Sequence, residues 1–203
     1  MESGSLACAP MLVVQMILGI AYLLCLLSVP LARGRLSALA DMELRRPSLA
    51  GAAIVIQVGI VSIFPGDLGP LGEPLHILSY LFLGAFAWSN RRITGLPIIA
   101  LGGLLNFVCI TVNGGVMPAD PDALAAIGRS PTSDEFINST ALANPKLAFL
   151  GDIIPTPASW PVSNVYSVGD LLILTGAFVL LHVACGSRIV PRRFRRTPAM
   201  AVA

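Results

Sequence analysis

Charged residues are scarce in this sequence. Asp, Glu, Lys and Arg make up only 12% of the 203 residues, whereas hydrophobic residues make up 55%. A soluble domain usually carries roughly 25% charged residues, so this composition favours lipid surroundings over water. The sequence also lacks a basic stripe with interleaved aromatic residues, and we therefore expect no nucleic-acid partner.

The spacings that metal and catalytic motifs need are missing as well. None of the four cysteines forms a CxxC pair or a metal-ligand spacing. Cys25, Cys109 and Cys185 lie inside apolar runs, where a free cysteine usually acts as a small buried hydrophobe. There is no nucleophile elbow, phosphate loop, zinc motif or haem-ligand pair. We expect no metal and no cofactor.

What the sequence does contain is a series of long apolar runs. About 20 apolar residues cross a hydrocarbon core of about 30 Å. The runs predict an all-α membrane protein, a single domain over 1–203 built as a bundle of about five transmembrane helices. The predicted spans are 11–32, 49–65, 75–90, 93–112 and 168–187.

The basic residues gather beside alternate connections between these runs. Eleven of the thirteen follow the first, third and fifth runs, including those of a basic tail at 188–203, and only Arg129 and Lys146 lie elsewhere. The positive-inside rule then predicts an N-terminus outside and a C-terminus inside. Lys146 is the single lysine in a chain rich in Ala, Gly and Pro, which suggests a GC-rich bacterial genome. We expect a multi-pass protein of the bacterial inner (cytoplasmic) membrane.

The segment 113–167 is much longer than most connections, and long ordered loops are often functional. Its apolar residues, such as Phe149 and Ile153, need a surface to bury against, so we expect a folded extracytoplasmic lid rather than a disordered linker. Pro121 and Asp122 favour a short helix within it. The lid would bring together two groups of polar residues: Asn113, Asp152, Asn164 and Asp170 with His76 and Tyr80.

Local structure alone explains several of these residues. Ser167 is suited to be the N-cap of the last helix, with Asp170 at its third position, and Gly114 with Gly115 is suited to end the helix before the loop. His182, near the other end of the last helix, is more often a packing or hydrogen-bonding residue than a ligand.

Four motifs resemble those of a family of small, uncharacterised bacterial integral membrane proteins, a domain of unknown function. They are Arg33-Gly34-Arg35-Leu36 (RGRL), 113–118 (NGGxMP), 150–155 (LGDIIP) and 164–170 (NVxSxGD). The resemblance covers nearly the whole chain after residue 10. It implies a shared fold and points to the loop, but it implies no reaction and no cofactor.

Three functions are open. The first is a non-catalytic protein that binds lipid or a small molecule, or an accessory subunit of a larger membrane complex, with membrane lipid as its partner. Its binding residues would be Asn113, Gly114, Gly115, Asn164, His76 and Tyr80 at the extracytoplasmic face. The second is a small membrane enzyme acting on an isoprenoid or lipid, with Asp152 and Asp170 as its acid/base pair. The third is a transporter component.

Overall fold

The computed structural model describes residues 8–60, 71–128, 139–160 and 163–191. The end of the predicted span 49–65 and most of the predicted basic tail lie outside these ranges. The helices are α1 (Cys8–Leu31), α2 (Pro47–Val58), α3 (Gly72–Ser89), α4 (Leu96–Val112), α5 (Pro121–Ala126) and α6 (Val168–Ala184). Two short 3-10 turns are η1 (Leu36–Leu39) and η4 (Ala148–Leu150). Four two-residue strands are β1 (Met117–Pro118), β2 (Ser139–Thr140), β3 (Ile154–Pro155) and β4 (Val165–Tyr166).

The antiparallel pair α4 and α6 is joined along a seam of glycines. Gly102 lies against Gly169, and Gly95 lies against Gly176, so the two contacts are seven residues, or about two helical turns, apart. A Cβ atom on Gly176 would come within 2.7 Å of the backbone nitrogen of Ile99. The backbones approach this closely only because these four positions have no side chain.

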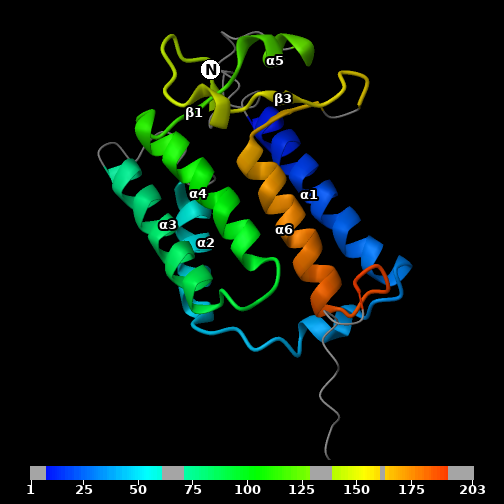
Figure 1. Ribbon diagram of the computed structural model, residues 1–203. Helices are drawn as coiled ribbons and strands as arrows, with labels where there is room; N and C mark the ends of the chain where they lie inside the picture. The colour runs from blue at the N-terminus through cyan, green and yellow to red at the C-terminus, as the bar shows by residue number, and fades with distance from the viewer. Residues whose placement is uncertain (1–7, 61–70, 129–138, 161–162, 192–203) are drawn as a thin grey trace, which may run out of the picture.

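Polar side-chain contacts also join other pairs of helices. Gln57 of α2 donates to the hydroxyl of Ser79 on α3 at 2.6 Å. Ser28 of α1 and His182 of α6 share a hydrogen bond of 2.9 Å between Oγ and Nε2. These bonds join α2 to α3 and α1 to α6, which are neighbours in Figure 1.

The segment between α4 and α6 folds across one end of the helices (Figure 1). β1 pairs in parallel with β2, and β3 pairs antiparallel with β4. The segment has its own small hydrophobic core, in which α5 packs on the strand region through Ala119, Ala123, Leu124, Ile127 and Val165. We call residues 113–167 the lid. The predicted helix at Pro121 is confirmed, with Asp120 as its N-cap.

The predicted bundle of five transmembrane helices is wrong. Within the ranges that the structure describes, no helix combines the length and the apolar character needed to cross a membrane. α2 has 12 residues, and α4 and α6 have 17 each, which is about 26 Å at 1.5 Å per residue against a hydrocarbon core of about 30 Å. The fold class is corrected to a helical protein. The predicted multi-pass localisation in the inner membrane, with its orientation, is wrong for the same reason.

The error comes from equating an apolar run with a helix. The fourth run was taken to begin at Ile93, but Gly95 has a φ of +94° and α4 begins only at Leu96. The fifth was taken to reach Ser187, but α6 ends at Ala184 and Gly186 follows with a φ of +66°. Apolar residues outside the helical hydrogen-bond ladder add to a hydropathy sum without adding to helix length.

Candidate functional site

The first turn of α6 is closed by the capping box that the sequence predicts. The backbone nitrogen of Asp170 donates to Ser167 Oγ at 3.0 Å, and the backbone nitrogen of Ser167 donates to Asp170 Oδ2 at 3.0 Å. Each side chain therefore satisfies a backbone N–H group that the start of a helix leaves without a partner. Ser167 is fully buried, which makes this bond costly to lose.

Asn106 of α4 completes a network with this cap. Its Nδ2 donates to Asp170 Oδ1 at 2.8 Å, and its Oδ1 accepts from the hydroxyl of Ser167 at 3.0 Å. The amide lies directly against Gly169, in space that any side chain there would occupy. Both carboxylate oxygens of Asp170 are thus engaged within the protein, which is the arrangement of a structural cap.

The negative charge of Asp170 raises the pKa of all three tyrosines of the chain. Burial, followed by that charge, raises the pKa of Tyr80 to about 12. Burial likewise raises the pKa of Tyr22 and of Tyr166, and Asp170 adds to both effects. The phenols come from α1, α3 and β4, so the charge of Asp170 acts on groups from three different elements. They remain neutral at physiological pH and can serve as hydrogen-bond donors.

An aromatic row extends from this region along α3. Tyr80 packs against Phe107 of α4 with ring centroids 4.9 Å apart, and against His76 at 5.0 Å. Burial lowers the pKa of His76, and its Nε2 finds no hydrogen-bond partner among the described residues. Tyr80 is therefore the member of this row that lies nearest the influence of Asp170, and His76 packs behind it.

Asn113 joins the lid to the end of α4. Its Nδ2 donates to the carbonyl of Lys146 at 2.8 Å, and its Oδ1 accepts from the backbone nitrogen of Lys146 at 2.8 Å. The amide thus pairs with the lid backbone as a neighbouring strand would. Gly114 and Gly115 have φ values of +71° and +90°, which confirms the predicted end of the helix and turns the chain toward β1.

Asp152 lies within the lid. Its side chain is buried, its backbone nitrogen donates to the carbonyl of Pro118 at 2.9 Å, and its carbonyl accepts from the nitrogen of Asp120 at 2.9 Å. The absence of a side chain on Gly151 lets the carbonyl of Pro118 approach. The charge of Asp152 reinforces burial in raising the pKa of Cys109, while a hydrogen bond from Asn113 opposes that shift.

Asn164 is buried directly before β4 and holds the lid hairpin formed by β3 and β4. Its backbone nitrogen donates to Thr156 Oγ1 at 2.7 Å, and its carbonyl accepts from the same hydroxyl at 3.0 Å. Its side chain lies beside Tyr166 and partly offsets the rise in the pKa of that phenol. Asn164 is thus placed by lid structure rather than by the helices.

The predicted site residues therefore fall into two groups. Asp170, Tyr80 and His76 lie among the helices, whereas Asp152 and Asn164 lie in the lid, and Asn113 with Gly114 and Gly115 connects the two. Sequence reasoning did not pair Asn106 with Asp170, although an asparagine within an apolar helix signals a buried polar contact. Lys146 was also missed, and no sequence signal marks it because only its backbone takes part. In the described part of the chain, no group of three His, Cys, Asp or Glu side chains could hold a metal ion.

Fold and site together define a small helical protein with a glycine-packed helix pair, a buried capping network and a folded lid. Residues 41–182 match a family of unknown function, DUF5317, and the chain belongs to this family. An uncharacterized protein of Thermotoga maritima is 31% identical over 138 residues, which is 66% of this chain and 73% of that protein. No solved structure matches the chain. The predicted membership of a family of unknown function is confirmed, although the match begins after the Arg33–Leu36 motif.

Proposed function

We propose that this protein is a non-catalytic lipid-binding protein whose apolar helix faces contact acyl chains beside the lid. The observation that carries the proposal is the distribution of its large apolar side chains. On α1, α2, α3 and α4, such side chains point outward and are about half exposed or more: Leu23, Leu24, Ile54, Val55, Leu81, Leu101 and Leu104. Exposed apolar surface spread over four helices is typical of a protein that binds an apolar partner.

The contacts between helices show the opposite composition. The α4 and α6 seam is made of glycines, and the buried side chains on the helices include the small residues Ala53, Cys109 and Ser79. Small residues let the backbones approach closely, while many of the bulky residues remain outside. A folded chain that keeps its leucines outside gains free energy only when something covers them, at about 25 cal/mol per Å² of apolar area removed from water.

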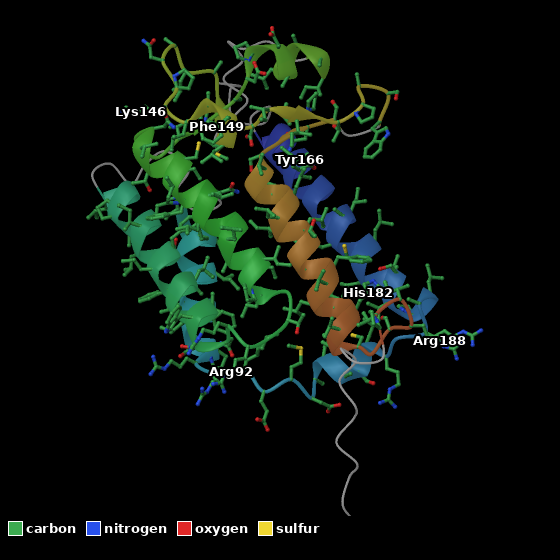
Figure 2. All side chains as sticks on the ribbon, viewed as in Figure 1. Arg92, Lys146, Phe149, Tyr166, His182 and Arg188 are labelled. Atoms are coloured by element: carbon green, nitrogen blue, oxygen red, sulfur yellow. The ribbon has the colours of Figure 1, made fainter. Side chains whose placement is uncertain are left out.

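Lipid suits these faces better than a single protein partner. The exposed side chains lie on α1, α2, α3 and α4, so they surround the helices instead of forming one patch. Flexible acyl chains can cover several faces at once, whereas a protein partner covers one. The lid adds Phe149, which is 65% exposed and lies at one end of the helices in Figure 2, and Trp160, which is 56% exposed.

The enzyme alternative loses support at Asp170. A general acid or base must offer its carboxylate to a substrate, but Asn106 and Ser167 engage both oxygens of Asp170. Asp152 lies in the other group of residues, within the lid backbone. No observation favours the transporter alternative.

Binding to neutral phosphatidylcholine vesicles tests the proposal with the full chain. The pair Leu101→Ser and Leu104→Ser removes apolar area from the α4 face, and we expect about 30-fold weaker binding, since each half-exposed leucine contributes about 1 kcal/mol. The matched control is Leu36→Ser with Leu44→Ser, the same chemical change at exposed leucines between α1 and α2. Absence of vesicle binding by the unaltered chain, with no lipid in its purified form by mass spectrometry, would overturn the proposal.

A further inference from the structure

Exposed arginines gather at the end of the helices opposite the lid. Two follow α1, two precede α2 and two lie between α3 and α4: Arg33, Arg35, Arg45, Arg46, Arg91 and Arg92. Arg188 follows α6 and lies at the same end, as Figure 2 shows for Arg92 and Arg188. The acidic residues among them are Asp41 and Glu43. This arginine end is therefore strongly positive.

Backbone hydrogen bonds join the segments that carry these arginines. The backbone nitrogen of Arg35 donates to the carbonyl of Cys185 at 3.0 Å, and that of Arg188 donates to the carbonyl of Ala32 at 2.8 Å. Asn90 accepts from the backbone nitrogen of Arg45 at 2.8 Å and donates to its carbonyl at 2.8 Å. The backbone of the segments that carry these arginines is thus held to the helix ends by hydrogen bonds.

Two of these arginines occupy backbone conformations that favour glycine. Arg33 has a φ of +57° and Arg46 a φ of +54°. Arg33 ends α1 in a Schellman motif, in which its own nitrogen bonds the carbonyl of Pro30 and the nitrogen of Gly34 bonds the carbonyl of Val29. α6 ends in the same motif with Gly186 at the equivalent position. An arginine where glycine fits better points to a role for its side chain.

The arginine end is continuous with the apolar helix faces. Trp88, 70% exposed, lies in the last turn of α3, and the guanidinium of Arg91 stacks over its ring at 4.6 Å. Arg91 also donates to the carbonyl of Trp88 at 2.9 Å. A tryptophan with a stacked arginine places an apolar ring and a positive charge side by side, which matches the junction of an acyl chain and its headgroup.

We propose that the arginine end binds the phosphates of anionic phospholipid headgroups while the acyl chains of the same lipids lie along the helix faces. The inference rests on the proposed lipid binding and adds its headgroup class. Guanidinium groups pair with phosphate oxygens in a two-pronged geometry, and each arginine near an anionic lipid surface strengthens binding about five-fold. Because the arginine end adjoins the apolar helix faces, it suits the phosphate of a lipid, which carries acyl chains, better than a free phosphate.

Opposite effects on stability and on binding test the proposal. The variant Arg33→Gly/Arg46→Gly removes two charges and two disfavoured backbone conformations. We expect its thermal midpoint to stay equal or rise by about 2 °C, while its affinity for phosphatidylglycerol vesicles falls about 25-fold. Affinity for phosphatidylcholine vesicles is expected to stay the same. The matched control is Leu147→Gly, since Leu147 has a φ of +51° at the lid end and carries no charge; it should leave the preference for phosphatidylglycerol intact.

The outcomes separate the two proposals. Equal binding of the unaltered chain to both kinds of vesicle overturns the headgroup inference alone, and so does an equal loss for both kinds in the arginine variant. Failure to bind either kind overturns the proposed function. Displacement from phosphatidylglycerol vesicles by a short DNA duplex at equal phosphate concentration would assign the arginine end to nucleic acid instead.

Discussion

Asn106 and Asp170 lie 64 residues apart in the sequence and share a hydrogen bond of 2.8 Å. Through it α4 holds the first turn of α6, because the same carboxylate accepts from the backbone of Ser167. The network links helix capping to the packing of two helices. Replacing Asp170 is therefore expected to lower the stability of the fold.

We expect Asp170→Ala to lower the free energy of unfolding by about 2 kcal/mol, since it removes a cap and leaves the amide of Asn106 without its acceptor. Urea unfolding measures the change. The control is Asp122→Ala in the first turn of α5, where the exposed side chain makes this change worth no more than about 0.5 kcal/mol. Equal effects of the two substitutions would contradict the cap and return the carboxylate of Asp170 to consideration for chemistry.

Adjacent glycines of α4 are predicted to respond in opposite directions. A Cβ atom at Gly102 would meet the carbonyl of Gly169 and, at 2.9 Å, the nitrogen of Ile173, whereas one at Gly103 would meet nothing within 4 Å. Gly102→Ala should therefore destabilise the chain by about 1–3 kcal/mol. Gly103→Ala should stabilise it by up to about 1 kcal/mol, because alanine is the better helix former.

Denaturant midpoints of these two variants check the glycine seam. Because both substitutions add the same methyl group to the same helix, the comparison cancels effects on the unfolded chain. Destabilisation of similar size in both variants would mean that the close approach of α4 and α6 is not what Gly102 provides.

Features set by neighbouring residues were predictable from the sequence. Ser167 with Asp170, Pro121 and Gly114 each act within one turn of their own position, so capping and turn rules located them. The pairing of Asn106 with Asp170 and of Asn113 with Lys146 was not predictable, because it depends on which helices meet and in which register. Composition could not supply that information either.

The membrane prediction failed for a related physical reason. Hydropathy and arginine placement are summed over runs of sequence, but Gly95 and Gly186 interrupt those runs with positive φ angles. Hydropathy also does not report which way a side chain points. It does not distinguish Val55, which points outward, from Ala53, which is buried in the same helix. Those directions, which carry the proposed function, required the three-dimensional arrangement.

The closure of the lid is predicted to depend on the side chain of Asn113 and on the backbone, but not the side chain, of Lys146. Asn113→Ala removes two hydrogen bonds to the lid, and we expect a loss of about 1–2 kcal/mol with faster amide hydrogen exchange at residue 146 and through η4. Lys146→Ala keeps the backbone groups and should change neither quantity. Unaltered exchange at residue 146 in Asn113→Ala would show that other contacts hold the lid.

His182 is predicted to make stability depend on pH. Ser28 donates its hydroxyl proton to the carbonyl of Cys25 at 2.7 Å, so its oxygen accepts from Nε2 of a neutral His182. Burial lowers the pKa of His182 below its ordinary value of 6.5. The unfolded chain therefore takes up a proton before the folded chain does, and stability is complete above pH 6.5 and falls as the pH drops below it.

The expected loss between pH 7.5 and pH 5.5 is about 1 kcal/mol for this one group, measured by urea unfolding at each pH. Burial also lowers the pKa of His76, so the slope has two sources with the same sign. His182→Gln should remove one part and His76→Gln the other, and the double variant should be flat over this range. A slope that survives in the double variant would assign the pH dependence to other groups, and a flat profile in the unaltered chain would mean that His182 takes up its proton as readily in the folded state as in the unfolded one.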